Sequence, residues 1–104
     1  MAWVILLVAG LLEVVWAFAL KQSEGFTRLG ASAVTIVSLI ASLVLLSLAM
    51  RTLPLGTAYT VWTGIGAVGA FVVGVIVLGE AATPLRITAA ALIVTGLVVM
   101  KLAD

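Results

Sequence analysis

The sequence predicts an all-α membrane protein with four transmembrane helices, and three observations lead to that prediction. Of the 104 residues, 65% are hydrophobic and only 9% are charged, whereas a soluble domain has about 25% charged residues. The charged residues are clustered, which leaves four long apolar segments between them. Each segment is close to the roughly 20 residues that one helical span requires. The chain is therefore too apolar for a water-soluble fold, and its length allows at most four spans.

The composition also excludes several classes of function. The chain has no Cys and no His, so it has no disulfides, thiol nucleophiles or Ser-His triads and almost no means of binding a transition metal. A formal net charge of +1 argues against nucleic-acid binding, which needs clustered Lys and Arg. We therefore expect a protein that is not an enzyme and that holds no metal and no cofactor.

The first two spans are expected at residues 2–20 and 29–50. The first is apolar apart from Glu13, and the polar loop after it runs from Lys21 to Arg28. The second contains no charged residue. Small residues near the end of the first span look like a leader-peptidase site, but no Lys or Arg precedes the apolar run and a carboxylate interrupts it. We therefore expect this segment to remain in the chain as a transmembrane helix.

The third and fourth spans are expected at residues 54–78 and 84–103, in a single domain of residues 1–104. No charged residue occurs from Thr52 to Gly79. Thr83 followed by Pro84 is typical of a helix N-cap with proline in the first turn. The apolar part of the last segment is short by itself, but its charged ends can extend to the membrane surface, which gives about 20 residues of helix. The fourth segment is therefore long enough to span.

The basic residues are divided almost evenly between the two sides of the membrane. With four spans, Arg51 and Lys101 lie on one side, and Lys21, Arg28 and Arg86 lie on the other. The positive-inside rule gives almost no preferred orientation for such a chain. Either the positive-inside rule is simply weak for this chain, or the even distribution of Lys and Arg indicates that the chain inserts in both orientations and pairs with its inverted copy. An antiparallel dimer of that kind has the inverted symmetry on which many alternating-access transporters are built.

One carboxylate lies inside a predicted span. Glu13 is near the middle of the first span, where an ionised side chain costs at least ~2.5–3.5 kcal/mol. No Lys or Arg lies in a span at comparable depth, so no structural ion pair is visible. Glu13 is either a protonated residue that hydrogen-bonds a neighbouring helix, or a functional group, as intramembrane ionisable residues usually are. A buried carboxylate holds a proton or a cation but not both, which is the exchange that an antiporter needs.

Other polar and aromatic side chains are expected at similar depth. Ser38 and Ser42 are four residues apart and share one face of the second span. One face of the third span carries, at helical spacing, Tyr59, Trp62, Thr63 and Gly66. A buried indole or phenol needs a hydrogen-bond partner, and a facing carboxylate can supply it. The alternative is that the aromatic residues only pack and the serines bond back to their own helix.

The glycines of the third span have two interpretations. Residues 64–69 match the dinucleotide fingerprint G-x-G-x-x-G, but they lie inside an uncharged span rather than between a strand and a helix, so the match is false. Gly64 and Gly66 either allow close helix packing or bend the helix as a hinge. In the fourth span, Ala89, Ile93 and Gly96 form a narrow seam suited to packing or dimerisation.

Three segments together resemble the small multidrug resistance family of four-helix transporters, and the resemblance covers nearly the whole chain. They are residues 13–17 (Glu-Val-Val-Trp-Ala) with Leu20 and Lys21, residues 23–28 (Ser-Glu-Gly-Phe-Thr-Arg), and residues 53–59 (Leu-Pro-Leu-Gly-Thr-Ala-Tyr) continued by residues 62–67 (Trp-Thr-Gly-Ile-Gly-Ala). Within the family, Trp16 three residues after the glutamate and the string from Trp62 to Ala67 are similar to the guanidinium-exporting subtype. The subtype that exports polyaromatic drugs usually lacks that tryptophan.

The resemblance implies an antiparallel homodimer in a bacterial inner membrane. The two copies of Glu13 would alternately bind protons and one guanidinium ion. The resemblance places around these carboxylates Gly10, Trp16, Ser42, Tyr59 and Trp62. Two residues depart from the pattern, since Thr60 stands where alanine is common and Ala89 replaces a glycine of the dimer contact in the better-known drug exporters. This sequence thus matches the family pattern less closely on the third-helix face and at the dimer contact than at the site residues.

The chemistry of the ion agrees with that subtype. Guanidinium is planar, permanently charged and rich in N–H donors, so it matches a carboxylate in a bidentate pair. It has little apolar surface, so charge, hydrogen bonds and stacking on Trp16 or Trp62 must hold it. The alternatives are export of quaternary ammonium or lipophilic cation drugs with the same glutamate, a proton-conducting subunit, or an accessory subunit of a larger complex.

Overall fold

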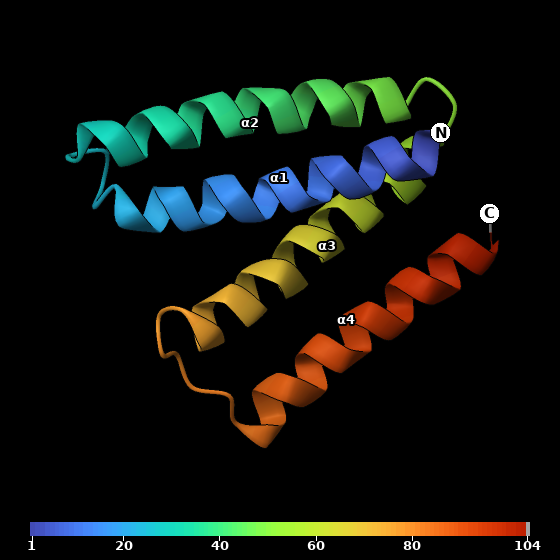
Figure 1. Cartoon of the computed structure of the whole chain (residues 1–104). Helices are drawn as coiled ribbons and strands as arrows, with labels where there is room; N and C mark the ends of the chain where they lie inside the picture. Colours follow the sequence, from blue (N-terminus) through green and yellow to red (C-terminus); the bar gives the residue numbers. More distant parts are fainter. Residues whose placement is uncertain (104) are drawn as a thin grey trace.

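The computed structural model describes residues 1–103, and this range contains four helices (Figure 1). The helices are α1 (Ala2–Gln22), α2 (Leu29–Ala49), α3 (Leu55–Ile76) and α4 (Pro84–Ala103). Each of them is long and apolar enough to cross a membrane. The predicted all-α chain with four such helices is confirmed.

The connection between α1 and α2 is a tight turn. α1 continues to Gln22, two residues beyond the expected span. Ser23 is fully buried, and its hydroxyl donates to a carbonyl in the last turn of α1 at 2.7 Å. Glu24, Gly25 and Phe26 follow with φ values of 49°, 74° and 67°. Three successive residues in the left-handed region therefore reverse the chain direction.

The connection between α3 and α4 begins earlier than expected. α3 ends at Ile76, two residues before the end of the predicted span, and Gly79, with a φ of 69°, turns the chain. At the start of α4, the backbone N–H of Arg86 donates to Thr83 Oγ1 at 3.2 Å. This hydrogen bond is the N-cap that was predicted at Thr83 and Pro84.

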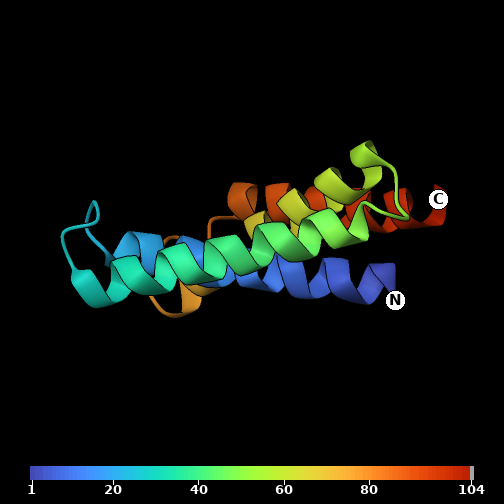
Figure 2. The same cartoon turned by 90° about the horizontal axis from the view of Figure 1, so that it is seen from above.

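The four helices form a flat bundle, with Cα extents of 41 × 34 × 17 Å (Figure 2). α1 and α2 lie side by side and antiparallel, and α3 crosses α1 at an angle (Figure 1). The backbone of α4 approaches only that of α3, and no described residue of α4 is buried. The N-terminus, the α2–α3 connection and the end of α4 lie at one end of the bundle, and the other two connections lie at the opposite end (Figure 1).

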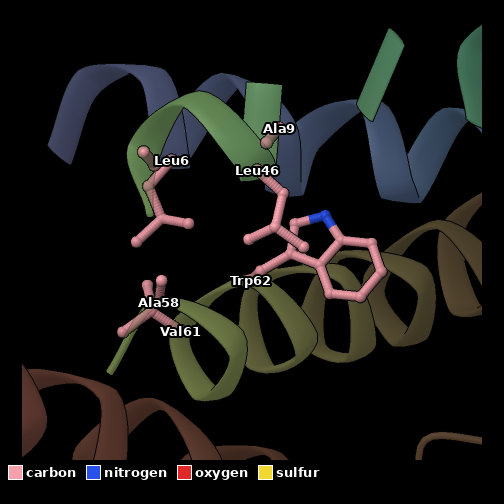
Figure 3. Packing of buried hydrophobic residues seen from close by; sticks show 7 residues of the cluster. Leu6, Ala9, Leu46, Ala58, Val61 and Trp62 are labelled. Carbon is pink, nitrogen blue, oxygen red and sulfur yellow. The ribbon is translucent and has the colours of Figure 1, made fainter. Parts of the chain in front are cut away.

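The buried core joins the first three helices (Figure 3), through residues of the first half of α1, the end of α2 and the first half of α3. Its members come from α1, α2 and α3 and are Leu6, Ala9, Leu46, Ala49, Ala58, Val61 and Trp62. The indole nitrogen of Trp62 points towards α1 and α2 (Figure 3). The core therefore fixes the height and rotation of an aromatic residue that was predicted to belong to the site.

Small polar residues form most of the face of α2 that meets α1. The buried residues of α2 recur at three- and four-residue spacing and are Ser32, Thr35, Ser38, Ser42, Leu46 and Ala49. Ser32, Thr35 and Ser38 donate their hydroxyl hydrogens to carbonyls one turn earlier in the same helix. Because these side chains are short and internally bonded, the two helices can approach closely.

Two glycines make room for branched side chains on neighbouring helices. A Cβ atom on Gly10 of α1 would lie 2.6 Å from Cγ2 of Ile65 on α3. A Cβ atom on Gly64 of α3 would lie 2.5 Å from Cδ2 of Leu97 on α4. Gly64 is thus a packing contact with α4, and α3 is helical throughout its length.

Candidate functional site

The Glu13 carboxylate lies between α1 and α3, against the bare backbone of Gly66. A Cβ atom on Gly66 would overlap the carboxylate and would lie 2.6 Å from Cγ of Glu13. Gly66 is itself buried, and Glu13 is half-buried near the middle of α1. Glycine is therefore the one residue at position 66 that leaves this carboxylate where it is.

Two buried polar atoms of α1 have no hydrogen-bond partner among residues 1–103. They are Oε1 of Glu13 and Nε1 of Trp16, and both atoms are buried. The two residues are three positions apart on α1, so their side chains share one face of the helix. Leaving a buried polar atom unpaired costs on the order of 1–3 kcal/mol. One face of α1 thus carries a buried acceptor and a buried donor that make no hydrogen bond within residues 1–103.

One hydroxyl ties three helices together, one turn away from Glu13. Ser42 of α2 is fully buried and donates to the backbone carbonyl of Ala9 on α1 at 2.7 Å. The same oxygen accepts a hydrogen bond from Nε1 of Trp62 on α3 at 3.0 Å. In an α-helix, the carbonyl of Ala9 is also the acceptor for the backbone N–H of Glu13. The Ser42 tie therefore fixes the segment of α1 that carries the carboxylate.

The structure separates two serines that the sequence placed on one stripe. Ser38 bonds back to the carbonyls of Val34 and Thr35 in its own helix, whereas Ser42 bonds to α1 and α3. Ser38 thus follows the alternative in which a serine bonds back to its own helix, and Ser42 does not. Neither hydroxyl contacts the Glu13 carboxylate directly in this chain.

The two other predicted site residues of α3, Tyr59 and Thr63, lie on its exposed side. The ring of Tyr59 contacts that of Trp62, with centroids 5.6 Å apart and planes at 54°. Tyr59 is 53% exposed, and Thr63 is also exposed. Together with Gly96 of α4, both line an open groove of about 570 Å³ between α3 and α4. Within one chain, this groove is a separate face from the contact between Glu13 and Gly66.

The other predicted residues, Gly10 of the site and Ala89 and Gly96 of the α4 seam, lie away from the Glu13 carboxylate in this chain. Gly10 is buried against Ile65 rather than against the carboxylate. Ala89 is exposed and lines a small cavity next to Phe71. A Cβ atom on Gly96 would meet no heavy atom within 4 Å. The seam of α4 is thus an open face in this chain.

Gly66 is the contact that reasoning from the sequence did not identify. The sequence placed Gly66 on the same face as Trp62, but interpreted it as a hinge or a packing residue. One sequence feature could have identified this contact. Gly66 is four residues after Trp62, so it lies on the helix face that was expected to meet the carboxylate. The space that a glycine leaves can be assigned to a partner only when the neighbouring helix is placed.

Replacing Ser42 by alanine is expected to lower the free energy of unfolding by about 1–3 kcal/mol, because the indole N–H of Trp62 loses its buried partner. Unfolding in mixed detergent micelles, followed by tryptophan fluorescence, measures this loss. Ser38→Ala is the matched control, since its hydroxyl bonds only to its own helix and its removal should cost less. Equal losses in the two variants would contradict a structural tie at Ser42.

Four membrane-spanning helices with a single acidic side chain inside them define a small integral membrane protein of the transporter class. The family model described as "Small Multidrug Resistance protein" matches residues 1–103. The chain belongs to this family, as the sequence indicated.

Curated relatives cover almost the entire chain. Proteins named "Guanidinium exporter" from Citrobacter freundii and Salmonella typhimurium are each 59% identical to it over 102 residues, which is 98% of this chain and 97% of each relative. The protein of the same name from Escherichia coli (strain K12) is 56% identical with the same coverage. Bacterial exporters as relatives and four spanning helices together confirm the expected location as an integral protein of the bacterial inner membrane.

Proposed function

We propose that this chain exports guanidinium, or small guanidinyl compounds, in exchange for protons, with Glu13 as the shared binding group. The observation that carries the proposal is a buried carboxylate oxygen of Glu13 and a buried indole N–H of Trp16, both without a hydrogen-bond partner, on the same face of α1. The relatives named as guanidinium exporters, at 56–59% identity over almost the full chain, support the choice of ion.

The carboxylate and the indole match guanidinium in complementary ways. A planar guanidinium ion donates two parallel N–H bonds to one carboxylate. The indole of Trp16 offers a donor that can orient the carboxylate and a π face on which a planar cation can stack. Gly66 leaves the room on the α3 side that the carboxylate itself occupies. Charge, direction and shape are thus supplied by three residues.

Coupling to protons follows from competition for one group. A protonated Glu13 has no negative charge to attract the cation, and a cation paired with the carboxylate excludes the proton. Glu13 is the single ionisable residue inside the spanning segments at this depth. Alternating exposure of this residue to the two sides of the membrane then exchanges protons for guanidinium.

We further infer that two chains assemble as an antiparallel homodimer. α4 buries none of its described residues, and the exposed groove between α3 and α4 carries Tyr59 and Thr63. A second copy on this face would cover those two residues and the open face of α4. The almost even division of basic residues between the two ends of the bundle fits insertion in both orientations. A tag-accessibility assay that found a single orientation for every chain would overturn this part.

Guanidinium uptake by purified protein in liposomes tests the proposed function. With an acidic interior, protons leave the liposomes and labelled guanidinium should accumulate inside. Collapse of the pH gradient with an ionophore should stop the accumulation, and empty liposomes supply the background. Uptake of tetraalkylammonium without uptake of guanidinium would favour a drug exporter, and uptake of guanidinium that does not depend on the gradient would contradict proton exchange.

Glu13→Asp is expected to retain guanidinium binding and to change the pH optimum of transport. The shorter side chain keeps the carboxylate but withdraws it from Gly66, so the balance between proton and cation binding changes. Uptake measured over a series of external pH values at a constant gradient gives the profile. A profile that coincides with that of the wild type would contradict the role of Glu13 as the shared site.

A further inference from the structure

An apolar groove of about 440 Å³ lies between α1, α3 and α4, at the end of the bundle that carries the N-terminus. The backbones of α1 and α4 do not meet, and α3 forms the floor between them. The lining includes Trp3, Leu7, Ile65, Val98 and Lys101. Among the described residues that line the groove, Lys101 alone is charged. The groove therefore has an apolar interior and one cationic group.

Lys101 is situated where the groove reaches the membrane surface. It belongs to the last turn of α4, and Trp3 belongs to the first turn of α1. The ammonium of Lys101 lies over the indole ring of Trp3, 5.0 Å from the ring centroid. Tryptophan and lysine at the ends of spanning helices are typical of the level of the lipid headgroups. An ammonium group and an indole ring thus occupy the headgroup level directly above an apolar channel.

We propose that this groove binds one anionic phospholipid of the surrounding bilayer, with an acyl chain along the groove and the phosphate at Lys101 and Trp3. The cation supplies charge complementarity to the phosphate, and the indole N–H can donate to a headgroup oxygen. The lining residues Val4 and Leu102 are 55% and 80% exposed. The groove is thus open along its side to the hydrocarbon from which an acyl chain would enter.

The size of the groove favours an acyl chain over a helix from a second copy. An α-helix is about 10–12 Å across, so one turn of it occupies roughly 400–600 Å³. The whole groove has about this volume, so a helix from a second copy could cover it from outside but could not enter it over more than one turn. A flexible hydrocarbon chain can follow the groove along α4.

The opposite end of α4 provides a comparison. Arg86 lies 5.7 Å from the centroid of the Phe71 ring, beside a cavity of about 170 Å³. A cation above an aromatic ring is therefore present at both ends of α4, but the larger apolar groove lies next to Lys101. The proposed lipid site depends on the combination of both features.

Native mass spectrometry of detergent-solubilised protein tests the headgroup contact. Phosphatidylglycerol and phosphatidylcholine with identical acyl chains are titrated separately, and bound lipid is counted. In Lys101→Gln, affinity for phosphatidylglycerol should fall about fivefold, the effect of one basic residue at a membrane surface, and affinity for phosphatidylcholine, whose choline offsets the phosphate charge, should fall less. Lys21→Gln is the matched control, because Lys21 is also in the last turn of a helix and lies outside this groove. Equal losses in the two variants would overturn the proposal.

A second pair of variants tests the groove itself. Val98→Phe fills the groove, whereas Val99→Phe changes the adjacent residue, which is 58% exposed and outside the lining. Val98→Phe should reduce the number of retained lipids of both kinds, and Val99→Phe should not. Unchanged lipid retention in Val98→Phe would overturn the proposal. A lower oligomeric mass with unchanged lipid retention would also overturn it and would assign the groove to a second copy.

Discussion

Glu13→Gln is expected to abolish guanidinium uptake driven by a pH gradient, to the background of empty liposomes. Glutamine has nearly the same shape as glutamate, so it can occupy the space against Gly66. It cannot ionise, however, and therefore can neither release a proton nor pair with a cation. Hydrogen bonds to charged groups contribute about 1.5–3 kcal/mol, so binding should weaken by roughly 10- to 150-fold. Exchange should be lost altogether, since no proton is carried.

Glu24→Gln is the control for this prediction. Glu24 lies in the connection after α1 and forms an exposed ion pair with Arg28, with an N–O distance of 3.3 Å. Exposed ion pairs contribute little to stability, so uptake by this variant should stay within about twofold of the wild type. Gradient-driven uptake by Glu13→Gln at the wild-type rate would reject the proposed mechanism.

Gly66→Ala is expected to reduce transport at least tenfold while leaving the fold intact. The added Cβ atom would overlap the Glu13 carboxylate, which is the end of a flexible side chain. The carboxylate should therefore move, and the helix should stay in place. Alanine also has a higher helix propensity than glycine by about 1 kcal/mol, so α3 should lose no stability. A displacement of about 1 Å at a binding group can change a rate by roughly a hundredfold.

Two measurements separate this effect from general damage to packing. Thermal unfolding in detergent should show Gly66→Ala to be at least as stable as the wild type, while liposome uptake falls. Gly30→Ala is the control, because a Cβ atom at Gly30 meets no heavy atom within 4 Å, and both its stability and its uptake should be retained. If Gly66→Ala transported guanidinium as the wild type does, the carboxylate position seen here would not be the one used in transport.

The sequence predicted the fold well because composition and charge placement determine it. Apolar segments without charges have few alternatives to helices in a membrane, and the Thr83 cap followed from local residue preferences alone. The ends of α1 and α3 differed from expectation by two residues each. Those ends depend on turn conformations, such as the left-handed residues at positions 24–26, which hydropathy does not encode.

The candidate site could be predicted only in part from the sequence. Ser38 and Ser42 have the same chemistry and share a helix face, yet only Ser42 has a carbonyl of another helix within reach. Periodicity identifies the face of a residue but not the atoms opposite it. The same limit applies to Gly66, whose partner is 53 positions away in the chain, and to Lys101 and Trp3, which lie at opposite ends of the sequence.

The loose attachment of α4 has a consequence for how this protein can evolve. The Ser42 hydroxyl joins α1, α2 and α3 around Glu13, whereas the backbone of α4 approaches only α3 and leaves its own residues uncovered. Substitutions on the outer face of α4 therefore leave the carboxylate and its supporting hydrogen bonds in place. Natural variation can thus change what the outer face of α4 contacts without disturbing the residues packed around Glu13.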